Sequence, residues 1–290
     1  MADFLQFAFS GLTVGAIYAL VALGFTIIYN ASDVVNFAQG EFVMIGGMLT
    51  VFAYAAGLPL PVAALLAVIV AVFVGLALEW LAIEPARDAP PVTLIIITIG
   101  VSISLRALAQ VVSDKQSHSL PAFPGDEPIR IGGAALLPQS FWVLGSAIVI
   151  FLALYAFFNH TLTGKAVLAT AANRFAARLV GINTTFVMAL SFGVSAAIGA
   201  VAGVLVTPIT LTSYDVGTLL ALKGFASAML GGMGNPIGAV IGGLLVGLLE
   251  AFGAGYINSE YKDAIAFLVI LGVLFVMPQG LFGRTHTERV

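Results

Sequence analysis

Apolar segments long enough to cross a lipid bilayer follow one another along almost the whole chain. They fall at residues 4–29, 41–56, 61–83, 92–112, 141–158, 185–207, 216–230, 236–252 and 264–277. A membrane-spanning helix needs about 20 apolar residues, and backbone groups in lipid must be hydrogen-bonded within their own segment. These segments are apolar on all sides and lack the alternation of barrel strands. We therefore predict an all-α polytopic membrane protein with about eight transmembrane helices, forming a single domain over residues 1–290.

Composition excludes several other classes of protein. Hydrophobic residues make up 60% of the chain and charged residues only 9%, whereas soluble domains carry about a quarter charged residues. The net charge of −3 gives no indication of nucleic-acid binding. The chain has no cysteine, and its three histidines lack metal-ligand spacing, so we predict no catalytic residues, no metal site and no cofactor in this chain.

Two apolar segments, 41–56 and 216–230, are short and border polar or glycine-rich sequence, as half-helices or re-entrant segments do. The first follows NASDVVNFAQGE (30–41) and the second precedes GGMGN (231–235). Polar or unwound backbone at membrane depth is tolerated only inside protein or along a watery cavity. We therefore predict a translocation path lined by Asn36, Gln39, Glu41, Gly231, Gly232, Gly234 and Asn235.

Each of these two stretches also has a simpler interpretation. Residues 30–41 can form an ordinary cytoplasmic loop, and Glu41 can serve the N-terminus of the following helix, where a carboxylate is favourable. Glycines can instead permit close helix packing, which we expect for Gly238, Gly242, Gly243 and Gly247.

Intramembrane charges are few. We expect Arg106 to be paired or to face water, and Lys223 to pair with Asp215 or Glu250, because unpaired charges in a membrane are costly.

The hydrophilic connections indicate how the chain is oriented. Residues 113–138 carry mixed charge with several prolines and glycines, and we predict an exposed external loop. Residues 159–183 contain Lys165, Arg174 and Arg178 but no acidic residue, and the tail adds Arg284 and Arg289. Lysine and arginine are enriched in cytoplasmic loops, so both regions are expected inside, and counting back five spans places the N-terminus outside.

The cationic segment is alanine-rich, which predicts a short helix that begins at Gly164 and ends at Gly181. Arg174 and Arg178 would then lie one turn apart without a carboxylate between them, an arrangement that destabilises a helix slightly. An external anion would relieve this repulsion. From the residues alone, anionic lipid headgroups and a docked cytosolic protein explain the charge equally well.

Four stretches, in order, resemble the permease subunits of branched-chain amino acid (Liv-type) ABC importers. They are the opening 11–47 with its Asn-Phe-Ala-Gln-Gly-Glu motif, GKAVLATAANRFAARLVGIN (164–183), LGGMGNPIGAVIGG (230–243) and the ending 260–284. The resemblance implies that residues 159–183 form a cytoplasmic coupling segment that contacts an ATPase. The residues it assigns to this contact are Gly164, Lys165, Ala169, Arg174, Arg178, Gly181 and Ile182.

The resemblance also implies the rest of the assembly: two cytoplasmic ATPase subunits that bind ATP and Mg²⁺, a second homologous permease subunit in a heterodimer, and a periplasmic or extracellular substrate-binding protein. The location would be the bacterial inner membrane, in contact with lipid. This chain has no phosphate-binding loop of its own, since Asn159 and Ala166 replace the glycine and hydroxyl that a Gly-x-x-x-x-Gly-Lys-(Ser/Thr) motif requires.

We therefore expect an ATP-driven importer of branched-chain or other hydrophobic or neutral amino acids. Two alternatives stay open from the sequence. The first is an ABC permease for urea or short amides, and the second is an ion-coupled secondary transporter, which would need intramembrane carboxylates for coupling.

Overall fold

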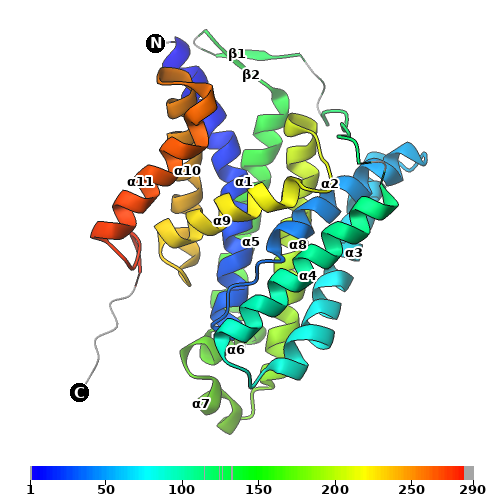
Figure 1. The fold of residues 1–290 in the computed structure, drawn as a ribbon, viewed down its shortest axis with the longest axis vertical. Coiled ribbons are helices and arrows are strands. Elements are labelled where there is room, and N and C mark those ends of the chain that lie inside the picture. The colour runs from blue at the N-terminus through cyan, green and yellow to red at the C-terminus, as the bar shows by residue number, and fades with distance from the viewer. Residues whose placement is uncertain (1, 114, 124, 126, 132, 284–290) are drawn as a thin grey trace.

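The computed structural model describes residues 2–283 apart from 114, 124, 126 and 132, and the described part of the chain is almost entirely helical (Figure 1). The elements are α1 (Ala2–Ser32), α2 (Gln39–Ala55), α3 (Leu60–Leu78), the π-helical turn η1 (Glu79–Ile83), the 3₁₀ turn η2 (Glu84–Ala86), α4 (Pro91–Val112), β1 (Ile129–Ile131), β2 (Ala134–Leu136), α5 (Pro138–His160), α6 (Leu162–Ala172), α7 (Arg174–Leu179), α8 (Thr184–Thr210), α9 (Val216–Gly231), α10 (Pro236–Tyr256), the 3₁₀ turn η3 (Ser259–Tyr261) and α11 (Lys262–Val276). The predicted all-α membrane class is confirmed.

Each of the nine apolar segments forms a helix. Six of the described helices are long and apolar enough to cross a membrane: α1, α3 with its extension to Ala86, α4, α5, α8 and α10. The other three, α2, α9 and α11, have 17, 16 and 15 residues. The two segments predicted to be short are therefore short, and α2 begins with buried residues inside the bundle.

The centre of the bundle is α1, which is buried over most of its length and packs against α8, α9 and α10. Glycines allow α1 and α10 to approach closely. A Cβ on Gly15 would lie 2.9 Å from the Leu244 Cα, and one on Gly243 would lie 2.5 Å from the Ala19 Cα. Close packing through small residues is the usual means of helix association in lipid. The packing role predicted for the glycines of residues 238–247 is confirmed.

The two ends of the bundle carry different elements (Figure 1). At one end, the Gln6 amide exchanges hydrogen bonds with the backbone of Ala135 in the β1–β2 hairpin, at 2.7 and 3.0 Å. The opposite end carries α6 and α7. The N-terminal end of α1 and the 113–138 region therefore lie together, away from the cationic segment, as the charge pattern predicts. The tail arginines 284 and 289 lie outside the described residues.

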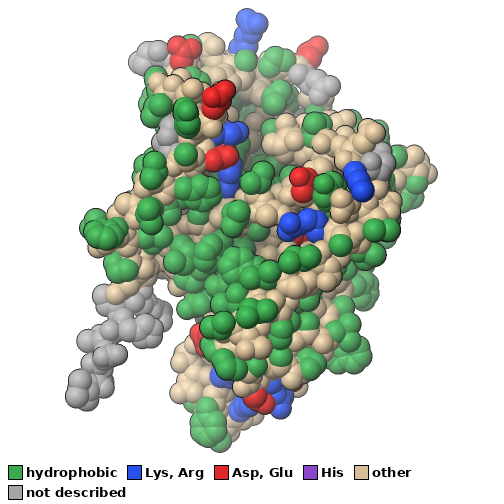
Figure 2. Space-filling view, in the orientation of Figure 1, with side chains coloured by type: hydrophobic (Ala, Val, Ile, Leu, Met, Phe, Trp, Pro, Cys, Tyr) green, Lys and Arg blue, Asp and Glu red, His purple; other side chains and the backbone are tan. Residues whose placement is uncertain are grey.

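Charged and hydrophobic side chains are also distributed differently between the ends and the middle of the bundle. On the face drawn in Figure 2, hydrophobic side chains cover much of the surface between the two ends. Charged side chains gather near α6 and α7 and in the opposite half. The hairpin itself was not predicted from the sequence, because two strands of three residues are too short to produce a readable alternation.

Candidate functional site

The connection between α1 and α2 re-enters the bundle. The chain turns at Asp33, whose φ is 56°, and then runs back so that Asn36 is buried. The Asn36 Oδ1 accepts a hydrogen bond from the Ala38 N–H at 3.0 Å, and the Phe37 N–H donates to the Thr98 Oγ1 of α4 at 3.2 Å. A cytoplasmic surface loop is therefore the wrong interpretation for the second half of residues 30–41.

Gln39, the first residue of α2, joins three helices in the interior. Its Nε2 donates to the Ser195 backbone carbonyl of α8 at 3.2 Å, and its Oε1 accepts from the Ser195 Oγ at 2.6 Å. Gly24 of α1 leaves the space for this amide, since an added Cβ would lie 2.7 Å from the Gln39 Cδ. The amide thus fixes the start of α2 between α1 and α8. That Asn36 and Gln39 line a path stays a prediction.

Glu41 turns its carboxylate toward α4 rather than toward the helix terminus. Its Oε1 accepts hydrogen bonds from the Ser102 Oγ at 2.8 Å and from the Arg106 Nη2 at 3.0 Å. The N-cap residue of α2, Ala38, has no side-chain cap. A capping hydrogen bond from Glu41 is therefore not formed, although a negative charge in the first turn still suits the helix dipole. Arg106 is paired, as expected.

The stretch Gly231–Asn235 forms a tight turn between α9 and α10. Gly232 and Gly234 have φ values of 103° and 88°, a region that favours glycine. The Asn235 Oδ1 caps α10 by accepting from the N–H groups of Ile237 and Gly238 at 3.0 and 3.2 Å.

This turn also contacts the end of α1 and the segment that follows α11. Asn30 near the end of α1 donates to the Gly234 carbonyl at 3.0 Å, and the N–H groups of Leu281 and Phe282 donate to the carbonyls of Leu230 and Gly231. The helix is broken here, as predicted. A role of these glycines in the path stays a prediction.

A second ion pair lies between α9 and α10. The Lys223 Nζ is 2.8 Å from the Glu250 Oε1 and 2.7 Å from the Asp263 Oδ1. The other Glu250 oxygen accepts from the Tyr18 hydroxyl at 2.7 Å. Of the two predicted partners of Lys223, Glu250 is therefore right and Asp215 is wrong. Asp263 was missed, because it lies in a different helix 40 positions further along the chain.

The cationic segment folds differently from the predicted single helix. It forms two helices, because Asn173 ends α6 and caps α7 by accepting from the Ala176 N–H at 2.9 Å. The predicted start at Gly164 is also wrong: α6 begins at Leu162, and the Thr161 hydroxyl caps it by accepting from the Gly164 N–H at 2.9 Å. The predicted end is correct, since Gly181 adopts a φ of 87° just after α7.

Gly164 is needed for a close approach between α5 and α6. A Cβ at this position would lie 2.7 Å from the Phe158 Cα and closer still to the Phe157 carbonyl oxygen. Lys165 and Ala169 lie on the exposed side of α6, whereas Ile182 is partly buried against the main core. Gly164 and Ile182 therefore hold the segment to the bundle, and the exposed side of α6 is left accessible.

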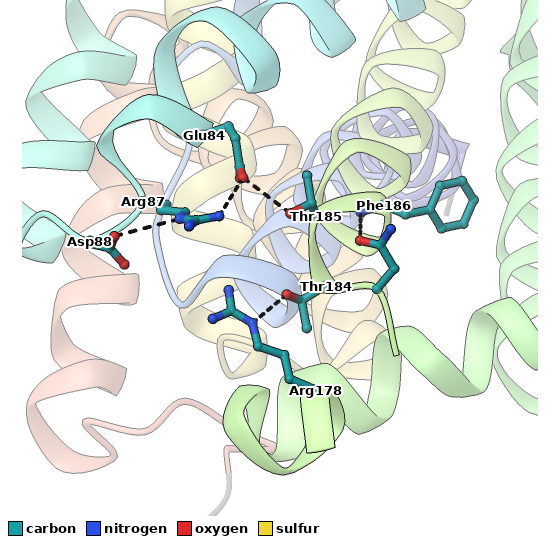
Figure 3. A network of polar contacts seen from close by, with 8 residues as sticks. Glu84, Arg87, Asp88, Arg178, Thr184, Thr185 and Phe186 are labelled. Carbon is teal, nitrogen blue, oxygen red and sulfur yellow. Dashed lines mark hydrogen bonds and ion pairs between the residues drawn. The ribbon is translucent and has the colours of Figure 1, made fainter. Parts of the chain in front are cut away.

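The two arginines of α7 differ in their contacts within the described residues: Arg178 makes a hydrogen bond, whereas the buried Nε and Nη2 of Arg174 have no hydrogen-bond partner. The Arg178 Nε donates to the Thr184 Oγ1 at the start of α8, at 2.9 Å (Figure 3). Arg174 is half-buried, and its charge acts on Asp33 at the end of α1. Partial burial raises the pKa of the Asp33 carboxyl, and the positive charge of Arg174 partly offsets this rise. Arg178 thus ties α7 to α8, and Arg174 acts on the α1–α2 connection through its charge alone.

A further contact joins α8 to the end of α3. Glu84 in η2 accepts from the Thr185 Oγ1 at 3.2 Å and pairs with Arg87 at 2.9 Å, as Figure 3 shows. The α6–α7 segment, the start of α8 and the end of α3 therefore form one hydrogen-bonded group at this end of the bundle.

The exposed surface of α7 is apolar. Phe175, Leu179 and Val180 each expose more than two thirds of their surface, and Leu162 of α6 is similarly exposed. Prediction from the charges missed this surface. The spacing of Phe175 and Leu179, one helical turn apart, could have indicated it.

The comparisons with known proteins agree with one another. Residues 7–274 match the family described as "branched-chain amino acid transport system / permease component". The chain is 37% identical to the high-affinity branched-chain amino acid transport system permease protein LivH of Salmonella typhimurium, and 33% identical to the corresponding protein BraD of Pseudomonas aeruginosa. Both alignments cover 99% of this chain and 98% of the relative.

One solved structure has a similar fold. PsaBC from Streptococcus pneumoniae, in complex with Fab, superposes with a TM-score of 0.53 at 15% identity, covering 96% of this chain and 94% of the other.

Proposed function

Because the chain belongs to the family of branched-chain amino acid transport permease components, we propose that it is the membrane-spanning subunit of an ATP-driven importer. Its substrates are branched-chain or other hydrophobic, neutral amino acids. The observation that carries the proposal is the match to LivH and BraD, which extends over almost the whole of each chain. An ion-coupled transporter is less well supported, because Glu41 and Glu250 are each already paired with a cation of this chain. Among the described residues this leaves Glu79 as a buried glutamate without an ion pair.

The α6–α7 segment is the proposed docking site for a cytoplasmic ATPase. Its exposed apolar residues Phe175, Leu179 and Val180 offer the kind of surface that a protein partner buries, and the exposed Lys165 adds a positive charge. Two such ATPases would bind ATP and Mg²⁺. The assembly would also include a second homologous permease subunit and an external substrate-binding protein, in the bacterial inner membrane.

Movement of the α6–α7 segment can be transmitted to the interior of the bundle through α8. Arg178 holds the first residue of α8, Thr184. Eleven residues further along, or about 16 Å at 1.5 Å per residue, Ser195 of α8 holds Gln39 at the start of α2. A shift of α7 would therefore displace α8 and with it the buried beginning of α2. In this mechanism packed helices carry the motion, and the residues of this chain perform no chemistry.

The test is uptake into proteoliposomes that contain this chain, its partner permease, the ATPases and the binding protein. We expect uptake of L-leucine that requires internal ATP and persists when proton and sodium gradients are collapsed. Urea, supplied in place of leucine, should not accumulate. Uptake that follows an ion gradient without ATP would overturn the proposal, and accumulation of urea but not leucine would favour the amide alternative.

A further inference from the structure

The Glu41–Arg106 pair has one partner inside the bundle and the other at its surface. The side chain of Glu41 is 1% exposed, whereas that of Arg106 is 30% exposed. The guanidinium group of Arg106 therefore shields the Glu41 carboxylate and is the part of the pair that lies at the surface of the bundle.

The direction of the Arg106 side chain differs from that expected of an arginine that faces lipid. It lies six residues, or about 9 Å, before the end of α4, so its side chain could extend toward the membrane surface as long cationic side chains do. Instead it pairs with a carboxylate in the first turn of α2. An arginine exposed to hydrocarbon is costly, so this side of α4 faces water or protein.

Polar residues lie at every fourth position along one side of α4, from its middle to its last turn. Thr98, Ser102, Arg106 and Gln110 follow one another at intervals of four along one side of the helix. A hollow of about 430 Å³ is lined by Gln110, Val111, Ser113 and Lys115. This hollow begins at Gln110, one helical turn beyond Arg106.

The pair is also incompletely hydrogen-bonded. The Glu41 Oε2, the Arg106 Nε and the Asn36 Nδ2 are buried and have no hydrogen-bond partner within the described residues. In the Lys223–Glu250 pair, by contrast, both carboxylate oxygens are engaged. Buried polar atoms are almost always hydrogen-bonded, so the free acceptor and donor atoms on the two halves of this ion pair can receive hydrogen bonds from, or donate them to, a ligand.

We propose that Glu41 and Arg106 bind the two charged ends of a zwitterionic α-amino acid, Glu41 its ammonium group and Arg106 its carboxylate. This inference rests on the proposed function and narrows its substrate to zwitterions. A zwitterion carries one positive and one negative charge, as the ion pair does. When it separates Glu41 from Arg106, each of these residues therefore gains a new partner of opposite charge, and neither is left unpaired. The guanidinium fork suits a carboxylate. Urea and short amides have no charge with which to separate the pair.

The first test compares substitutions in the assembled transporter. Glu41→Gln and Arg106→Gln should each lower L-leucine uptake by roughly tenfold or more, the scale of losing one hydrogen bond to a charged group. Arg106→Lys should retain part of the activity, and Lys262→Gln, which removes a half-exposed lysine elsewhere, should retain nearly all. If the unmodified transporter takes up no leucine, the proposed function fails. If it does and both glutamine variants match it in rate and KM, only the zwitterion site fails.

A second test separates binding from folding. The chain contains no cysteine, so Arg106→Cys introduces its only thiol, which can be modified after assembly. An aminoethyl methanethiosulfonate reagent, which restores a positive charge, should recover uptake, whereas the neutral methyl reagent should not. Equal recovery with both reagents would overturn the proposal.

Discussion

Replacing Phe175 with alanine tests whether the apolar surface of α7 holds the ATPase. Phe175 is 71% exposed, so it contributes little to the packing of this chain and most of its surface is free for a partner. Full burial of a phenylalanine side chain is worth about 1.5–3 kcal/mol. The exposed part therefore corresponds to roughly 1–2 kcal/mol, or about a 5–30-fold weaker association.

The assay is the affinity of the purified ATPase for the detergent-solubilised permease, measured alongside ATP-dependent uptake. Phe175→Ala should weaken binding by this factor and leave the thermal stability of the permease nearly unchanged. Phe73→Ala provides the matched control, because Phe73 of α3 is similarly exposed, at 64%, and is not part of the α6–α7 segment. Unchanged ATPase affinity for Phe175→Ala would refute docking through this surface.

Three further predictions concern stability and coupling. Gly164→Ala forces a methyl group against the backbone of α5. It should lower the stability of the protein by about 1–3 kcal/mol and uncouple ATP hydrolysis from uptake. Gly145→Ala, which fills open space, should have neither effect. The raised pKa of Asp33 means that the folded state binds a proton more readily than the unfolded state. Stability should therefore fall as pH rises through the interval between the two pKa values, and Asp33→Asn should remove this slope in denaturation curves. Lys223→Gln leaves the Glu250 carboxylate with a weakened pairing and should destabilise the protein by up to about 3 kcal/mol, and the double variant with Glu250→Gln should recover much of that loss.

Length and charge were sufficient to predict the membrane-spanning helices and to separate the cationic segment from the 113–138 region. Nine apolar segments became nine helices, and the two short ones, α2 and α9, are short because polar residues or glycines adjoin them. Local signals also identified Gly181 as the residue that ends the helical part of residues 159–183. The break at Asn173 was missed although the signal was present, since asparagine is a preferred N-cap and here it interrupts an alanine-rich run.

Other features could not be predicted because they depend on contacts between distant residues. Glu41 meets Arg106 across 65 positions, and Gly164 meets the end of α5 in three dimensions. A single sequence shows that a glutamate and an arginine both lie in apolar segments, but not that their helices are neighbours. The hydrogen bond of Arg178 was missed for the same reason, since its partner Thr184 belongs to another helix.

The placement of α2 connects the proposed docking segment with the proposed substrate site. Gln39 ties the first turn of α2 to α8, and Glu41, two residues later, ties the same turn to α4. Helix α8 is in turn held by α7 through Arg178, whereas α4 has few contacts with the rest of the bundle. A displacement of α8 that α4 does not follow therefore has to change the separation of Glu41 and Arg106. Opening of this ion pair by ATPase movement and its occupation by a zwitterion would then be the same structural event, which is what coupled transport requires.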